Sequence, residues 1–100
     1  MNEIEKLSAV LDRFEGVSDE GVQDTMSICR RRLAKINPEF VLTARAELQS
    51  IKRDIIEIAK STVYVQMDAD TLYDEDRAAF NAIRPIAEAA GESMRNELFS

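Results

Sequence analysis

The stretch from Pro38 to Gln66 carries the pattern that most limits what this chain can fold into. Apolar side chains and one threonine recur alternately three and four residues apart, which places them on one face of an α-helix. That face consists of Val41, Ala44, Leu48, Ile51, Ile55, Ile58, Thr62 and Val65, and it is widened by Ile56, Ala59 and Val63. We therefore predict one long central helix over about residues 38–66. A short strand over residues 61–65 is the alternative, because the sequence Ser-Thr-Val-Tyr-Val is β-prone.

The length of this helix sets a packing requirement. At 1.5 Å per residue it extends roughly 43 Å, whereas neighbouring helices of roughly 12 to 19 residues reach only about 18 to 28 Å. One neighbour cannot cover the whole apolar face. Two helices laid end to end, a second subunit or a break in the long helix must account for the remainder.

Two shorter helices are expected before Pro38. The first stops at Gly16 and has an apolar face that consists of Ile4, Leu7, Leu11 and Phe14. Ser18 is a suitable N-cap for the second helix, with Asp19 and Glu20 in its first turn. The apolar face of this second helix consists of Val22, Met26, Cys29, Leu33 and Ile36.

A further helix is expected after the long one. Its apolar face consists of Phe80, Ile83, Ala87, Ala90 and Met94. Pro85 lacks an N–H and its ring crowds the carbonyl of Asn81, so we expect a kink or a break near Arg84. Gly91 is expected to set off a short terminal helix. The fold class that we predict is all-α: a bundle of four or five helices in a single domain over residues 1–100.

The composition excludes several kinds of active site. The chain has no histidine, one cysteine and three glycines, so a Ser-His-Asp triad, a Cys/His zinc site and a glycine-rich phosphate loop cannot be built. Asp68 and Asp70 begin like a calcium loop. However, Leu72, Tyr73 and Ala79 occupy the positions of a ligand, the glycine and the bidentate glutamate. We predict no enzyme activity, no metal and no cofactor. A carboxylate-dependent enzyme is the alternative.

The sequence also predicts a cytoplasmic protein. Its single cysteine, Cys29, cannot form an intramolecular disulfide, which favours a reducing compartment. Cys29 lies on the apolar face of its helix, so we expect it to be a buried hydrophobe. The apolar runs are too short to span a bilayer, and the first residues lack the apolar core of a signal peptide.

The chain has a net charge of −6, and its charged residues fall into three blocks, of which the middle one is basic. Residues 29–60 contain eight bases and four acids, while both flanks are acidic. The consecutive Arg30, Arg31 and Arg32 fan out around a helix by about 100° each, so they form no stripe for nucleic acid. Two acidic clusters lack interspersed bases. The first consists of Glu15, Asp19, Glu20 and Asp24, and the second of Asp68, Asp70, Asp74, Glu75 and Asp76, with Tyr73 among them.

These clusters have two interpretations. The simpler one is that the acids are solvated side chains at turns and helix starts, where they favour capping and solubility. The other is that they form an anionic face that docks on a basic groove of another protein. Such a face would raise the encounter rate and exclude nucleic acid from the same bases. Tyr73 would then be an aromatic anchor of that interface.

The overall profile resembles that of small phage-encoded inhibitors, including anti-CRISPR proteins. The resemblance is one of length, acidity, helical content and missing catalytic residues. It covers the whole chain and involves no motif. It implies an inhibitor that binds a basic nucleic-acid-binding surface of a host complex, in some cases by mimicking DNA, without contacting nucleic acid or membrane itself. The alternative is a helical adaptor or homodimer that assembles through the apolar face of the long helix.

Overall fold

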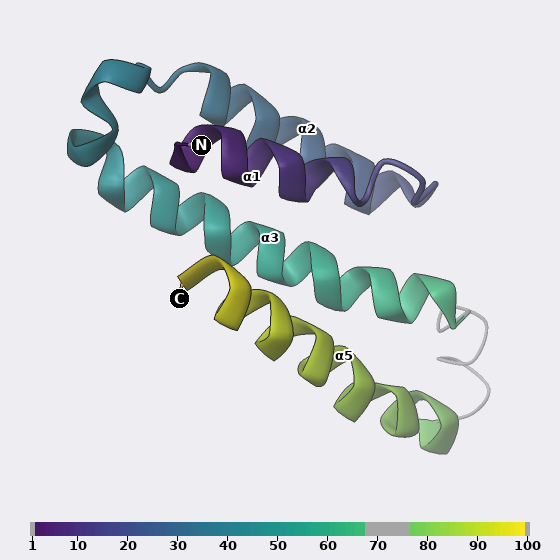
Figure 1. Cartoon of the computed structure of the whole chain (residues 1–100). Helices are drawn as coiled ribbons and strands as arrows, with labels where there is room; N and C mark the ends of the chain where they lie inside the picture. Colours follow the sequence, from purple (N-terminus) through teal and green to yellow (C-terminus); the bar gives the residue numbers. More distant parts are fainter. Residues whose placement is uncertain (1, 68–76, 100) are drawn as a thin grey trace. The chain divides into compact units, whose positions relative to one another are not determined.

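The protein is an all-α helical bundle, as the sequence predicts (Figure 1). The computed structural model describes residues 2–67 and 77–99, and these contain no β-strand. Their helical elements, in chain order, are α1 (Glu3–Asp12), α2 (Glu20–Ala34), the 3-10 helix η1 (Pro38–Ala44), α3 (Arg45–Gln66) and α5 (Arg77–Phe99).

The chain divides into two compact units, residues 1–55 and residues 56–100, which we call unit 1 and unit 2. The boundary falls between Ile55 and Ile56, inside α3, so no linker separates the units. Residues 45–55 of α3 belong to unit 1, and residues 56–66 belong to unit 2. The prediction of a single domain is not tested by this division and stays a prediction.

Unit 1 consists of α1, α2, η1 and the first half of α3. Helices α1 and α2 lie side by side (Figure 1). Ion pairs connect both helices to α3, through Lys52 and Glu3 for α1 and through Arg32 and Glu47 for α2. The apolar faces are buried, and their members in this unit are Leu7, Val10, Leu11, Val22, Met26, Cys29, Leu33, Leu48, Ile51 and Ile55.

Unit 2 consists of the second half of α3 and the whole of α5. Helix α5 runs back along this half of α3 (Figure 1). The Lys60 ammonium group lies 3.3 Å from the carboxylate of Glu88 on α5. The aliphatic part of the Lys60 side chain crosses α5 at Gly91, where an added Cβ atom would lie 2.9 Å from its Cγ and 2.7 Å from its Cε. Gly91 therefore allows the two helices of this unit to approach closely.

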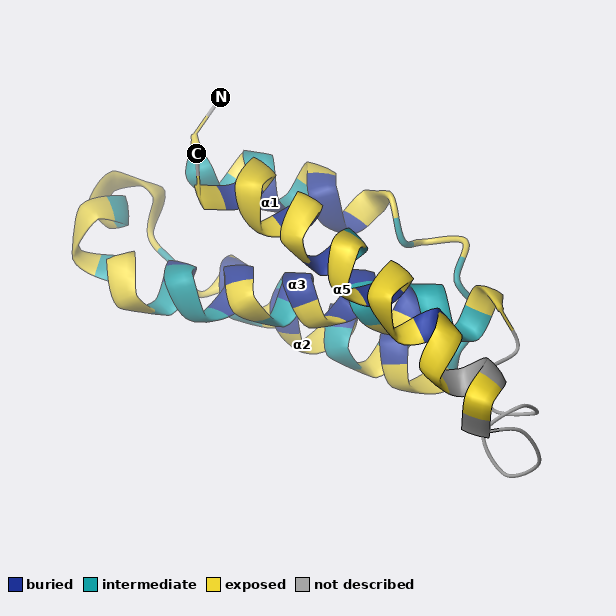
Figure 2. Ribbon diagram, turned by 90° about the horizontal axis from the view of Figure 1, so that it is seen from below, coloured by how far each residue is buried: buried dark blue, intermediate teal, exposed yellow. Residues whose placement is uncertain are grey.

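The long helix is present over the predicted residues, and residues 61–65 are helical rather than a strand. Its first seven residues form the 3-10 helix η1, with a kink at Phe40 (φ −121°, ψ 34°). No residue of η1 is buried, so no packing holds it in α-helical geometry, and 3-10 turns are common at the N-termini of helices. From Leu48 to Thr62 the predicted face is buried (Figure 2).

The covering requirement is therefore met within one chain from Leu48 to Thr62, whereas no residue of η1 is buried. In unit 1 the apolar face of α3 is covered by α1 and α2, and in unit 2 it is covered by α5. Thr62 is the only polar member of the face, and its hydroxyl donates a hydrogen bond of 2.8 Å to the carbonyl of Ile58. The buried hydroxyl is thus satisfied inside its own helix.

Two local predictions were wrong. The N-cap of α2 is Asp19 and not Ser18, and its carboxylate accepts a hydrogen bond of 3.0 Å from the backbone N–H of Val22. The helix consequently begins at Glu20. Asp and Ser are about equally good N-caps, so the sequence pattern could not separate two adjacent candidates.

Near Arg84, where the sequence predicts a kink or a break, the helix is not broken, because α5 is one helix that contains both Pro85 and Gly91. Pro85 removes one hydrogen bond from the carbonyl of Asn81. Both residues are exposed, so water can reach that carbonyl. Ile83 and Ala87 are buried on either side of the proline, and their packing holds the helix together across it.

Candidate interaction surfaces

Four of the eight bases in the middle segment, residues 29–60, form ion pairs with the chain's own carboxylates, beginning with Arg30 on α2. Its guanidinium group lies 2.7 Å from the carboxylate of Asp12, the last residue of α1, and 2.6 Å from the carboxylate of Glu15, which follows α1. The hydrogen bond with Asp12 is the main reason that the pKa of Arg30 is raised. One positive charge therefore meets two negative charges at this end of α1.

Arg32 makes the densest set of contacts in unit 1. Its guanidinium group donates to Glu47 at 2.5 Å, to Asp54 at 2.7 Å and to the hydroxyl of Ser50 at 2.8 Å. The hydrogen bond from Arg32 lowers the pKa of the Glu47 carboxyl group. Arg32 thus fixes α2 against the start of α3, and again one base serves two acids.

Two lysines of α3 also form ion pairs with the chain's own carboxylates. Lys52 is only 8% exposed, and its ammonium group donates to Glu3 at 2.9 Å, which connects α3 to the first turn of α1. Lys60 in unit 2 lies 3.6 Å from Glu57 and 3.3 Å from Glu88. The hydrogen bond with Glu88 is the main cause of the raised pKa of Lys60.

The first acidic cluster is split by these contacts. Glu15 is held by Arg30, and Asp19 serves as the N-cap of α2. Glu20 and Asp24 are exposed, lie one turn apart at the start of α2, and make no ion pair with any residue that the structure describes. The N-terminus of the helix favours acids in its first turn, which accounts for Glu20 but not for Asp24.

The second acidic cluster lies outside the described residues. This applies to Asp68, Asp70, Asp74, Glu75 and Asp76, and to Tyr73 among them. Their proposed role in partner binding stays a prediction.

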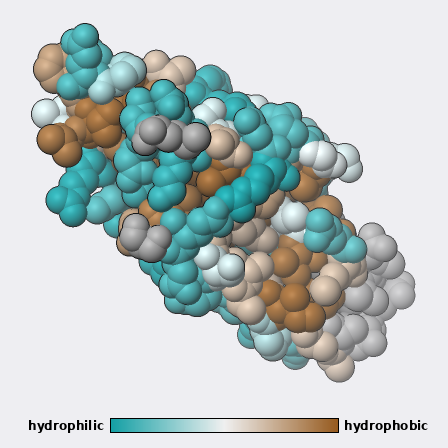
Figure 3. All heavy atoms as spheres, viewed as in Figure 1, coloured by the Kyte–Doolittle hydropathy of each residue, from teal (hydrophilic) through white to brown (hydrophobic). Residues whose placement is uncertain are grey.

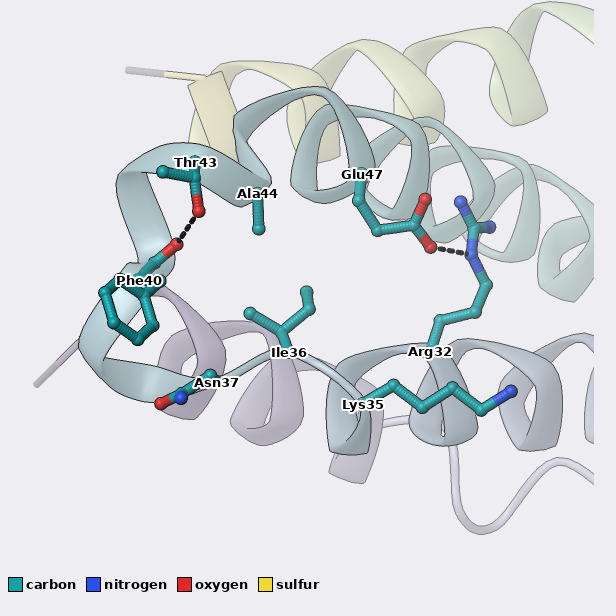
Figure 4. A pocket seen from close by; sticks show the side chains of 8 residues that line it. All are labelled: Arg32, Lys35, Ile36, Asn37, Phe40, Thr43, Ala44 and Glu47. Atoms are coloured by element: carbon teal, nitrogen blue, oxygen red, sulfur yellow. Dashed lines mark hydrogen bonds and ion pairs between the residues drawn. The ribbon is translucent and has the colours of Figure 1, made fainter.

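A surface that the sequence prediction missed lies where α2 meets η1 and α3. A cavity of about 430 Å³ opens there (Figure 4), lined by the apolar Ile36, Phe40 and Ala44 and by the polar Arg32, Lys35 and Glu47. Phe40 is 56% exposed and Leu42, two residues further on, is 91% exposed. Figure 3 shows hydrophobic atoms at the surface over η1. The available signal was that these two residues fall outside the three-and-four spacing of Val41, Ala44 and Leu48.

Cys29 behaves as the sequence predicts. Its thiol is buried, and this burial, followed by the charge of Asp54, raises the pKa of Cys29 to about 11. The thiolate that a nucleophile requires is therefore scarce at neutral pH.

Within residues 2–67 and 77–99, no three Cys, Asp or Glu side chains lie close enough to hold a metal ion together. The calcium-loop comparison at Asp68 and Asp70 lies outside those ranges. In the described part of the chain, each helix falls short of the length or the apolar character that crossing a bilayer requires.

Comparisons with protein-family models, with curated proteins and with solved structures give no match for this chain. The function proposed below therefore rests on the chain's own charges, exposed residues and contacts.

Proposed function

We propose that this chain is a non-enzymatic, acidic protein-binding module that inhibits a nucleic-acid-handling complex. In this proposal it acts in the host cytoplasm as a phage or mobile-element inhibitor of the anti-CRISPR or DNA-mimic type. It docks on a basic surface of the complex and blocks nucleic acid from binding there. The proposal requires no cofactor, no metal and no contact with nucleic acid or membrane by the chain itself.

The observation that carries the proposal is the pairing of the middle-segment bases. Arg30, Arg32 and Lys60 each engage two carboxylates, so each of these groups keeps a net negative charge. Arg30 and Lys60 pair with acids of the flanks, namely Asp12, Glu15 and Glu88, and an excess of acid remains in each group. The chain as a whole keeps a net charge of −6, which favours a basic partner.

The binding face proposed within the described residues is Glu20 and Asp24, together with Glu15 at its edge. Glu15 remains largely exposed although Arg30 contacts it, so its second carboxylate oxygen is available to a partner. Because these acids lie on a folded helix start, they form a fixed anionic surface that needs little ordering on binding. The acids of residues 68–76, which lie outside the described residues, are proposed as a separate contact with the partner.

The inhibition would follow from competition for the same bases. A nucleic acid binds its partner mainly through Lys and Arg contacts to phosphates, and carboxylates satisfy the same groups with comparable geometry. Binding of this kind weakens as salt rises, because the charges on both surfaces are screened. Steering by the negative net charge would also make association fast at low salt.

The test is a pull-down from bacterial lysate, treated with nuclease, at low and at high salt. We expect a nucleic-acid-handling complex that is retained at low salt only, and we expect the added chain to release a duplex from the purified complex. The double variant Glu20→Lys/Asp24→Lys should weaken this binding by at least tenfold, as should Asp74→Lys/Glu75→Lys/Asp76→Lys.

A matched control separates the local surface from the overall charge. Glu5 lies in the first turn of α1 and Glu92 lies on α5, both exposed and without an ion pair to a described residue. Glu5→Lys/Glu92→Lys changes the net charge as much as Glu20→Lys/Asp24→Lys does. If both double variants lose affinity equally, the acids at the start of α2 are not the docking face. Unchanged affinity in all variants rejects the inhibitor proposal.

The homodimer or adaptor proposal has less support from the packing. Ile55, at the centre of the apolar face of α3, is 0% exposed in the single chain. A second subunit therefore finds this face already covered. Sedimentation of the unmodified chain tests the alternative directly, since a monomer at high concentration contradicts it.

A further inference from the structure

We propose that the cavity between α2, η1 and α3 is a second binding site, which takes an acidic segment of another protein carrying large apolar side chains. This site is distinct from the anionic face, because its chemistry is apolar with a basic rim. It is formed entirely by residues of unit 1.

The apolar component is Phe40, which lines the cavity, together with Leu42, which is exposed two residues further along η1. A single exposed apolar side chain is ordinary on a protein surface. Here Phe40 and Leu42 are both exposed within one short segment, next to a concavity lined by Ile36 and Ala44. A volume of about 430 Å³ is within the usual range of ligand pockets and accommodates a large side chain from a partner.

The basic component consists of Lys35, which lines the cavity, and of Arg31 and Arg45, which are close to lining residues in the sequence but do not line the cavity themselves. Arg31 lies one turn before Lys35 on the same side of α2, and Arg45 follows directly on η1. All three are exposed, and none makes an ion pair with a described residue. Glu47, by contrast, already has its charge engaged by Arg32. Glu39 is the one acid of residues 31–47 that makes no ion pair with a described residue.

The unpaired charges in this part of unit 1 are mainly positive, whereas the net charge of the whole chain is negative. Bases in the last turn of α2 also offset the partial negative charge of the helix C-terminus, and that role needs no ligand. The helix dipole does not account for Arg45 or for the exposed Phe40 and Leu42. An acidic, apolar segment satisfies the bases and the apolar side chains together.

A second copy of this chain fits the site less well. In a symmetric dimer through this surface, the unpaired bases of both copies would be brought into the same interface. Two such basic rims repel each other, whereas a partner carrying carboxylates is attracted. We therefore assign the site to a different protein.

The experiment measures the binding of a fluorescent synthetic peptide that carries Leu-Phe between runs of Asp and Glu. One control peptide carries the same Leu-Phe between runs of Lys, and another carries Ser-Ser between the acidic runs. We expect the full chain to bind the first peptide, with affinity that falls as salt rises, and to bind each control at least tenfold more weakly.

Variants of the chain locate the binding. Leu42→Ser and Phe40→Ser should each weaken the first peptide by about tenfold, and Lys35→Glu should weaken it several-fold and reduce the salt dependence. Ile86→Ser is the matched control, because Ile86 is a similarly exposed apolar residue of α5 in unit 2. It should leave the affinity unchanged.

Three outcomes overturn the proposal. The first is no binding of the Leu-Phe acidic peptide at low salt. The second is equal binding of the lysine-flanked peptide, which would mean that the basic rim has no role. The third is self-association of the chain in sedimentation that Leu42→Ser abolishes, because the surface would then be an interface between two copies. Circular dichroism of each variant checks that helicity is kept.

Discussion

The 3-10 helix η1 and the helix α3 that follows it differ sharply in how their apolar side chains are used. In α3 the predicted apolar face is buried from Leu48 to Thr62. In η1 no residue is buried, and Leu42 is almost fully exposed. The two segments are continuous in sequence. The difference teaches that an apolar pattern contributes to the core only where another helix covers it, and that the uncovered part is available for binding.

The largest effect should come from a charge placed under the covered part. Ile55→Asp puts a carboxylate where the side chain is 0% exposed, without a partner to compensate. We expect a loss of roughly 4 kcal/mol in the free energy of unfolding. Urea denaturation followed by circular dichroism measures this. Leu42→Asp is the control, and a comparable loss in that variant would remove the contrast between the two segments.

The buried lysine of α3 should give the next effect. Lys52→Ala removes the partner of Glu3, one of whose carboxylate oxygens already lacks a hydrogen bond. Because Glu3 is partly exposed, we expect a loss of only about 1–2 kcal/mol in unfolding free energy. Lys52→Met keeps the packing of the side chain, and in the Glu3→Gln background it should be close to neutral. If Lys52→Ala is itself neutral, the ion pair contributes nothing to holding α1 on α3.

The effect of Gly91→Ala on the free energy of unfolding should change sign when the Lys60 side chain is removed. Gly91→Ala adds about 1 kcal/mol of helix propensity, but its Cβ must displace the Lys60 side chain and disturb the pair with Glu88. We expect a net loss of about 1 kcal/mol in unfolding free energy. In the Lys60→Ala background the same change should instead stabilise by about 0.5–1 kcal/mol. Thermal unfolding of the four proteins measures this, and stabilisation in both backgrounds would show that the contact is easily relieved.

The smallest effect belongs to the uncovered part. Leu42→Ser should change the free energy of unfolding by less than about 0.5 kcal/mol, because the side chain buries little surface. Chemical denaturation measures this difference. A loss above about 1 kcal/mol would mean that η1 is packed in solution and is not an open binding surface.

Much of the fold was predictable because it depends on local spacing. The residues from Ile4 to Leu33 that were expected in the core of α1 and α2 are largely buried, and so is the centre of the α3 face. The N-cap of α2 was missed by one residue, since Asp19 and Ser18 are comparable caps. The continuity of α5 through Pro85 was missed because it depends on packing of Ile83 and Ala87, which a local rule for proline ignores.

The candidate site was less predictable. The sequence identified Glu20 and Asp24 as part of an acidic cluster, but it could not show that Glu15 is held by Arg30, which comes from a different helix. For Phe40 and Leu42 the sequence shows only that they fall outside the three-and-four spacing of the long helix, and it does not show whether another helix covers them.

The sequence by itself determined the helical content, the length of the central helix and the acidic balance of charge. These follow from apolar spacing and from residue counts, which need no knowledge of neighbours in space. Only the tertiary structure decided which charges cancel and which apolar residues remain exposed. Ion pairing and burial depend on side chains brought together from distant parts of the chain, such as Lys52 with Glu3 and Lys60 with Glu88.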